Sequence, residues 1–209
     1  MAFASFASTA EGTADKMGVS EVNAASGQSG GARAIFLDRD GVLNRAMVRE
    51  GRPYPPAALE ALEILPGVPD AVRRLHDAGF LVIGATNQPD VARGTQRREV
   101  VEAMNAQLMA AMPITAILVC YEDGEDCPRR KPNPGLLLEA AGAYGIDLSA
   151  SFMVGDRWRD VEAGRRAGCQ TVFLDRGYAE SPPARPADHT ATDLPAAVTW
   201  ILSQTLHEG

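Results

Sequence analysis

Two aspartates placed two residues apart, Asp38 and Asp40, are the side chains of this sequence whose type and spacing best fit chemistry. They follow the apolar run of residues 34–37, which has the length of a buried strand, and Gly41 follows them. Two like charges so close repel each other, so we expect a cation that holds both ionised. Mg²⁺ prefers hard oxygen ligands and leaves room for phosphate. Taken alone, an Asp-x-Asp pair after an apolar run is more often a turn or a helix cap.

Three further polar groups recur downstream, two of them directly after apolar runs and one in a Pro-rich loop. These groups are Thr86 with Asn87, Arg130 with Lys131, and Gly155 with Asp156. Together with the aspartate pair they supply, in chain order, a nucleophile, a hydroxyl–amide pair, a cation and a second acid. Open α/β sheets bind their ligands at the carboxyl ends of strands, where most of these groups are expected to lie. The combination indicates an active site.

The four motifs resemble those of the haloacid dehalogenase-like (HAD) phosphatases. In this sequence they read Asp38-Arg39-Asp40-Gly41, Thr86-Asn87-Gln88, Arg130-Lys131-Pro132 and Val154-Gly155-Asp156-Arg157. Two longer segments are similar to the small capless branch of the family (subfamily IIIA). They are Asp-Arg-Asp-Gly-Val-Leu-Asn at residues 38–44 and Arg-Lys-Pro-Asn-Pro-Gly at residues 130–135. That branch holds the heptose 1,7-bisphosphate 7-phosphatases and the histidinol-phosphate phosphatases. The resemblance runs from about residue 34 to residue 178.

The resemblance implies a catalytic role for each acid and for the lysine. Asp38 attacks phosphorus and forms an aspartyl-phosphate. Asp40 protonates the leaving alkoxide and then takes a proton from the attacking water. Lys131 neutralises the transferring group. Asp156 completes a Mg²⁺ site with Asp38 and the backbone carbonyl of Asp40, although a Gly-Asp pair is also typical of a helix N-cap.

The substrate contacts implied by the resemblance come from five other side chains: Arg49, Thr86, Asn87, Arg130 and Arg157. The hydroxyl and the amide are expected to donate to phosphate oxygens, and the last two arginines to flank the site. Residues 44–66 are rich in Pro and Gly, so we expect a loop over the active site, too short for a cap domain. In that loop Arg49 is the expected contact and Arg52 the alternative, and two solvated surface arginines fit the composition equally well.

Apolar periodicity places alternating strands and helices along the rest of the chain. Strands are expected at residues 34–37, 80–85, 114–120, 151–154 and 170–174, and helices at 69–78, 96–112, 134–144, 158–167 and 196–206. This alternation predicts an α/β fold with a doubly wound parallel sheet in one domain, residues 32–209. Residues 1–31, rich in Ala, Ser and Gly, are expected to be a disordered extension, and residues 181–195 a Pro-rich tail.

Composition narrows the class of partner. A net charge of −7 among 209 residues argues against nucleic acid, and no apolar run approaches the roughly 20 residues that cross a bilayer. Three cysteines do not make a disulfide framework, which favours a reducing cytoplasm. The expected partner is a small phosphorylated metabolite, and the protein is expected to be a monomer.

The sequence differs from the zinc-binding members of its branch in the residues that would bind zinc. Zinc-binding members carry one cysteine, a nearby histidine and a Cys-x-Cys before the Arg-Lys-Pro motif. Here Cys120 and Cys127 remain, with Glu122 in place of the histidine and Arg129 in place of the last cysteine. Because a structural zinc site takes four thiolate or imidazole ligands, we expect no tightly bound zinc.

The sequence therefore predicts a Mg²⁺-dependent phosphomonoester hydrolase for a small sugar phosphate, with heptose 1,7-bisphosphate as the first candidate. Histidinol phosphate is the alternative substrate. A catalytically idle family member that binds phosphorylated ligands is the alternative of another class. Pro89 and Asp90 replace the Ser-Gly pair that often follows Thr-Asn-Gln in the heptose enzymes, which leaves the substrate open.

Overall fold

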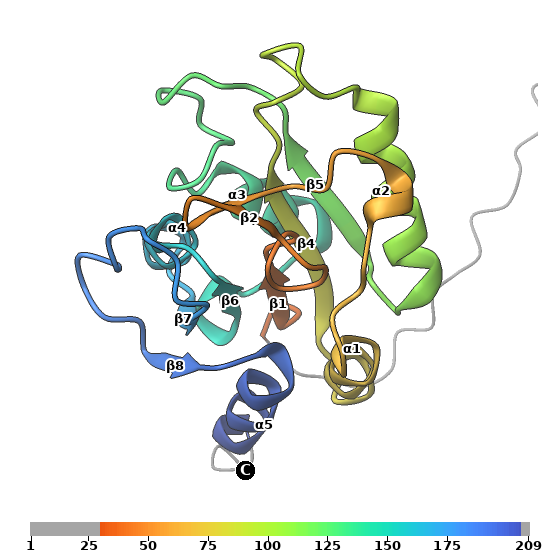
Figure 1. Ribbon diagram of the computed structural model, residues 1–209. Coiled ribbons are helices and arrows are strands. Elements are labelled where there is room, and N and C mark those ends of the chain that lie inside the picture. The colour runs from red at the N-terminus through yellow and green to blue at the C-terminus, as the bar shows by residue number, and fades with distance from the viewer. Residues whose placement is uncertain (1–29, 206–209) are drawn as a thin grey trace, which may run out of the picture.

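A six-stranded parallel sheet forms the centre of the computed structural model, which describes residues 30–205 (Figure 1). The expected N-terminal extension lies almost wholly outside the described residues. The strand order is β5-β4-β1-β6-β7-β8, and every pairing is parallel. The strands are β1 (Ala34–Leu37), β4 (Leu81–Asn87), β5 (Ala116–Cys120), β6 (Phe152–Gly155), β7 (Gln170–Leu174) and β8 (His189–Ala191). The predicted doubly wound α/β fold is confirmed.

Helices cover both faces of this sheet (Figure 1). They are α1 (Val68–Asp77), α2 (Arg98–Ala111), α3 (Gly135–Tyr144), α4 (Trp158–Ala167) and α5 (Leu194–Thr205). In β1, Ile35 and Leu37 enter one hydrophobic cluster, whereas Ala34 and Phe36 enter the other. The first cluster is closed by α1, α2 and α5, and the second by α3. A strand buried on both faces explains the uninterrupted apolar run read from the sequence.

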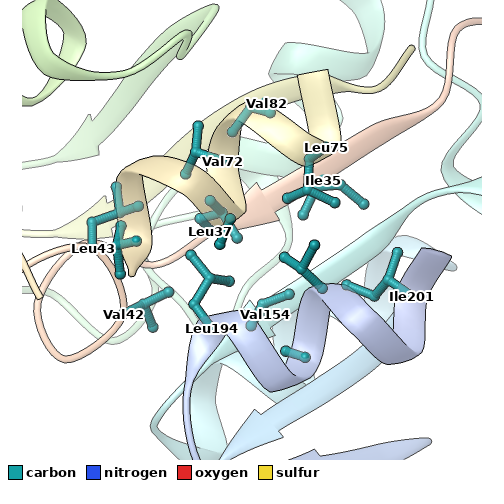
Figure 2. Close-up of a cluster of buried hydrophobic side chains, with 14 of the residues drawn as sticks. Ile35, Leu37, Val42, Leu43, Val72, Leu75, Val82, Val154, Leu194 and Ile201 are labelled. Atoms are coloured by element: carbon teal, nitrogen blue, oxygen red, sulfur yellow. The ribbon is translucent and has the colours of Figure 1, made fainter. Parts of the chain in front are cut away.

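The larger cluster is drawn in Figure 2, where side chains of α1 and α5 meet over β1. Val72 and Leu75 come from α1, and Leu194 and Ile201 from α5; all four are fully buried. Fully burying each such side chain contributes about 1.5–3 kcal/mol. This packing anchors the carboxyl end of β1, from which the aspartate pair emerges.

The position of β1 in the sheet determines where a ligand can bind. After β1 the chain builds β4 and β5 on one side, then crosses to build β6, β7 and β8 on the other side. The two neighbours of β1 are therefore β4 and β6, and the strand order reverses between them. Such a reversal opens a crevice at the carboxyl ends of the strands.

The expectation that residues 44–66 lack regular structure is wrong. They form the antiparallel hairpin β2 (Met47–Arg49) and β3 (Arg52–Tyr54), followed by the 3-10 helix η1 (Leu59–Ala61). The two residues of the turn, Glu50 and Gly51, both have positive φ, the geometry that suits a two-residue hairpin loop. Proline is tolerated in this ribbon because it has only two strands, both of them edges. As expected, the segment contains no cap domain.

The Pro-rich stretch of residues 181–195 also contains structure that the sequence did not indicate. Its strand β8 pairs with β7, and the ring of His189 stacks on Trp200 of α5 with centroids 4.4 Å apart. Helix α5 begins at Leu194, two residues before the expected start. None of the helices formed by residues 30–205 has the length and apolarity to cross a bilayer.

Candidate active site

A buried chain of charges, Asp38–Lys131–Asp160, lies at the carboxyl end of β1. The ammonium of Lys131 is 2.7 Å from Oδ1 of Asp38 and 2.6 Å from Oδ1 of Asp160. Burial raises the pKa of Asp38 to about 6, although Lys131 opposes this shift. Burial also disfavours the ammonium, but Asp160 and Asp38 outweigh it and raise the pKa of Lys131. Lys131 is therefore a fixed, charged group beside Asp38.

Asp40 lies at the edge of the same cavity and is held by three donors. Arg39, whose side chain is fully buried, forms an ion pair with Oδ2 of Asp40 at 2.9 Å. Asn44 donates to Oδ1 at 3.0 Å, and Gln88 donates to Oδ2 at 2.8 Å. The Nη1 atom of Arg39 donates to Oδ1 of Asn105 in α2. These contacts fix the Asp40 carboxyl in one orientation.

Thr86 and Asn87, at the end of β4, have different surroundings. Both line the cavity, and the Thr86 hydroxyl accepts a hydrogen bond of 3.1 Å from Gln88. The amide of Asn87 is paired with the backbone of Lys131: it donates to the carbonyl oxygen at 2.9 Å and accepts from the N–H at 3.0 Å. The structure thus pairs the Asn87 amide with the backbone of Lys131, and the contact to phosphate expected from the sequence stays a prediction.

Asp156, after β6, offers one free oxygen. Tyr178 donates to Oδ2 at 2.8 Å, whereas the buried Oδ1 has no hydrogen-bond partner. Carboxylate oxygens of Asp38, Asp156 and Asp160 lie within 4.8 Å of one another. The oxygens of Asp160 are already engaged by Lys131 and by the backbone N–H of Arg157. The oxygens of Asp38 and Asp156 therefore fit a hard cation such as Mg²⁺.

Gly41 is required for this arrangement. Its φ of 88° lies in the left-handed region, and a Cβ there would lie 1.7 Å from Oδ2 of Asp156. Only glycine allows the loop after Asp40 to approach Asp156 so closely.

A cavity of about 560 Å³ opens above these groups. Its lining includes Asp38, Asp40, Thr86, Asn87, Arg130, Lys131 and Arg157, seven of the nine residues expected at the site. Asp156 borders a smaller adjoining cavity. Arg49 lines neither of them, and its guanidinium lies over the ring of Tyr54 on the exposed hairpin. Arg52, the alternative, lines the large cavity instead.

The two arginines expected to flank the site each have a carboxylate partner. Arg130 forms an ion pair of 3.1 Å with Asp123 and donates to the backbone carbonyl of the same residue. Arg157 donates through two nitrogens to the carboxylate of Glu180, with one contact of 2.9 Å. Both guanidinium groups are thereby held at the rim of the cavity.

Comparisons with known proteins agree with this geometry. A family model described as HAD-hydrolase-like matches residues 128–198. A D-glycero-D-manno-heptose-1,7-bisphosphate 7-phosphatase of Thermosynechococcus vestitus is 37% identical over 191 residues, which cover 80% of this chain and 94% of that protein. The chain belongs to the HAD phosphatases. A second relative, the D-glycero-beta-D-manno-heptose-1,7-bisphosphate 7-phosphatase of Pseudomonas aeruginosa, is 38% identical over 151 residues and covers 68% of this chain and 81% of its own.

Solved structures show the same HAD phosphatase fold. The D,D-heptose 1,7-bisphosphate phosphatase from B. bronchiseptica, complexed with magnesium and phosphate, matches with a TM-score of 0.70 and 29% identity. The match covers 82% of this chain and 99% of that one. A putative HAD-like phosphatase from Mesorhizobium loti matches with a TM-score of 0.64 and 29% identity, covering 85% and 91% of the two chains.

In this HAD phosphatase the two cysteines of the loop before Arg130 lie together. The Sγ atoms of Cys120 and Cys127 are 3.6 Å apart and buried, and burial raises the pKa of Cys120 to about 11. Arg129 is turned toward Glu139 of α3 in an ion pair of 2.9 Å. The loop thus brings two thiols together, and the absence of tightly bound zinc remains a prediction.

Sequence reasoning missed several residues that organise the site, although some left a signal. Arg39 and Gln88 belong to the quoted motifs, and a charged residue inside a motif next to a buried strand was a sign of a buried ion pair. Asp123, Tyr178 and Glu180 lie in loops with no motif around them. Only the folded chain brings those three to their partners Arg130, Asp156 and Arg157.

Proposed function

We propose that this HAD phosphatase removes the 7-phosphate of D-glycero-D-manno-heptose 1,7-bisphosphate in a Mg²⁺-dependent reaction. The observation that carries the proposal is the contact of 2.7 Å between Asp38 and the buried ammonium of Lys131 at the carboxyl end of β1. It places a carboxylate nucleophile beside a fixed positive charge, where a phosphoryl group gains stabilisation as it is transferred. The names and coverage of the two bacterial relatives support the choice of substrate.

The first half of the reaction uses Asp38 and Asp40. A carboxylate oxygen of Asp38 forms a bond to phosphorus while the bond from phosphorus to the sugar oxygen breaks. Asp40, held by Arg39, Asn44 and Gln88, gives a proton to the departing alkoxide. The products of this step are heptose 1-phosphate, with a free hydroxyl at position 7, and the aspartyl-phosphate.

The second half returns the enzyme to its initial state. Asp40, now ionised, takes a proton from a water molecule as that water attacks phosphorus. The bond between phosphorus and Asp38 breaks, and inorganic phosphate leaves. Lys131 and the hydroxyl of Thr86 hold the phosphoryl oxygens in both halves, since both line the cavity beside Asp38.

Asp38, Asp156 and the backbone carbonyl of Asp40 would hold the Mg²⁺ ion, which supplies further neutralisation of phosphoryl charge when bound. The unpartnered Oδ1 of Asp156 supports this assignment. The three buried, free cysteines support the proposed cytoplasmic setting. The monomeric state expected from the sequence stays a proposal.

The test is phosphate release from a panel of esters with Mg²⁺, with and without EDTA. The panel contains both anomers of heptose 1,7-bisphosphate, histidinol phosphate and p-nitrophenyl phosphate. Fast, EDTA-sensitive release from one bisphosphate anomer is the expected result. Preferred hydrolysis of histidinol phosphate would replace the substrate, and phosphate-ligand binding without any turnover would indicate a non-catalytic member.

A further inference from the structure

The cavity contains more positive charge than its own carboxylates neutralise. Five arginines line it: Arg52, Arg93, Arg130, Arg157 and Arg159. Three of them form ion pairs with carboxylates of the cavity wall or rim, namely Arg93 with Asp90 and Asp123, Arg130 with Asp123, and Arg157 with Glu180. These three are therefore committed to the architecture of the cavity.

Arg159 is in a different state. Within residues 30–205 it forms no ion pair with a carboxylate, and its guanidinium lies over the ring of Trp158, 5.1 Å from the ring centroid. Its side chain is half-buried in the cavity wall. Burial, followed by the positive charges of Arg157 and Arg130, lowers the pKa of Arg159. The carboxylates of Glu180 and Glu125 oppose this shift without forming an ion pair with Arg159. An anion bound at Arg159 would relieve the repulsion that remains.

The place of Arg159 in the fold relates it to the reacting group. It lies in the first turn of α4, one residue before Asp160, whose carboxylate contacts Lys131 at 2.6 Å. The same cavity therefore contains the phosphoryl-transfer groups and an arginine without a carboxylate partner. Arg52 also lacks such a partner among the described residues, but it is exposed on the hairpin, where water screens its charge.

We propose that Arg159 binds the second phosphate of a bisphosphate substrate, the one that is not transferred. An arginine fork can donate two parallel hydrogen bonds to phosphate oxygens, and a partly desolvated guanidinium gains more from them than an exposed one. The proposal rests on the proposed function and assigns a specificity-determining residue to it. It also explains how the cavity recognises a second phosphate although Arg130 and Arg157 already have carboxylate partners.

The experiment compares substrates with and without the second phosphate. Steady-state kcat and KM are measured for heptose 1,7-bisphosphate, heptose 7-phosphate and p-nitrophenyl phosphate. The variants are Arg159→Ala, Arg159→Lys and Arg52→Ala, with Arg73→Ala as a control that removes the same charge from an exposed site on α1. The inhibition constant of inorganic phosphate reports on the transfer subsite alone.

For Arg159→Ala we expect KM for the bisphosphate to rise about 10- to 100-fold, the loss of a charge-assisted pair of hydrogen bonds. The constants for both monophosphates and for inorganic phosphate stay within about twofold, and Arg159→Lys is intermediate because it keeps the charge without the fork. An equal loss on all three substrates would show that Arg159 only positions α4. No change on the bisphosphate, or a selective loss in Arg52→Ala instead, would also overturn the proposal.

These outcomes are separate from failure of the proposed function. If the unmodified protein with Mg²⁺ releases no phosphate from any of the three esters, the hydrolase assignment fails before Arg159 is tested. If it hydrolyses the two monophosphates and the bisphosphate with equal KM, the hydrolase assignment stands and the role of Arg159 is wrong.

Discussion

Tyr178 donates a hydrogen bond of 2.8 Å to Oδ2 of Asp156, and this contact leaves the buried Oδ1 of the same carboxylate without a partner. The tyrosine belongs to the loop after β7, and the aspartate follows β6, the neighbouring strand. A hydrogen bond from behind a carboxylate fixes its orientation toward a metal ion. The pair therefore separates two tasks: one oxygen is held by the protein, and the other is available to Mg²⁺.

Tyr178→Phe removes only this hydrogen bond. We expect Mg²⁺ binding to weaken roughly 10-fold, because loss of a residue that orients a metal ligand typically costs 10- to 100-fold in affinity. Isothermal titration calorimetry with Mg²⁺ measures the dissociation constant. Tyr144→Phe, at the exposed end of α3, is the matched control and should bind Mg²⁺ normally. Unchanged affinity in Tyr178→Phe would contradict the orienting role.

Asp38→Asn tests the nucleophile. We expect kcat to fall at least about 1,000-fold, because an amide cannot form the acyl phosphate. The fold should remain, since burial raises the pKa of Asp38 and the neutral amide avoids the burial of a charge. The rate of phosphate release measures kcat, and thermal unfolding without Mg²⁺ measures whether the fold remains. Ordinary turnover in Asp38→Asn would exclude the covalent mechanism, and Asp77→Asn on the exposed end of α1 is the control.

The raised pKa of Asp38 also predicts how pH changes the effect of Mg²⁺. Without metal, the folded state holds a proton on Asp38 up to about pH 6, whereas the unfolded chain releases it near its ordinary pKa of 3.8. The free energy of unfolding of the metal-free protein therefore falls as pH rises through this window. Because Mg²⁺ competes with that proton, the same addition of Mg²⁺ should raise Tm more at pH 7.5 than at pH 5.

Thermal unfolding at the two pH values, with and without Mg²⁺, measures this difference. Asp38→Asn should reduce both the stabilisation by Mg²⁺ and its pH dependence. A stabilisation of equal size at pH 5 and pH 7.5 in the unmodified protein would show that protons and Mg²⁺ do not compete at this carboxylate.

Arg39 contributes to stability as well as to the site. Its side chain is fully buried and pairs with Asp40, so Arg39→Met leaves a partly buried carboxylate without its counter-charge. We expect the free energy of unfolding to fall by roughly 3–5 kcal/mol, measured by urea denaturation. The matched control is Arg45→Met, which breaks an exposed ion pair with Glu63 and should cost no more than about 1 kcal/mol. Equal losses in both variants would contradict this account.

The cysteine pair predicts a negative result for zinc. Cys120 and Cys127 supply two sulfur ligands, and Arg129 is engaged with Glu139, so residues 30–205 do not assemble four zinc ligands around these thiols. We expect less than stoichiometric zinc in protein purified without added metal. Burial raises the pKa of Cys120 to about 11, so its thiol should react slowly with an alkylating agent at pH 8. Stoichiometric zinc, or rapid alkylation of Cys120 in the folded protein, would refute this.

The sequence by itself determined the parts of this protein that depend on local pattern. Apolar runs and helical periodicity located five of the six strands of the sheet and the five helices to within a few residues, because apolar strands and amphipathic helices leave continuous signals. The sequence pointed to three charged side chains of the site because each belongs to a motif at the end of a strand or in a Pro-bounded loop. They are Asp38, Lys131 and Asp156.

Only the tertiary structure decided which charges meet. Asp123, Tyr178 and Glu180 lie in loops without periodicity, and their partners are 7, 22 and 23 residues away in sequence. The hairpin of β2 and β3 forms because Glu50 and Gly51 adopt positive φ together, and it places Arg52 rather than Arg49 on the cavity. An arginine in the sequence carries the same charge wherever it lies. The fold determines whether that charge is neutralised by a carboxylate, as in Arg157, or left for a ligand, as in Arg159.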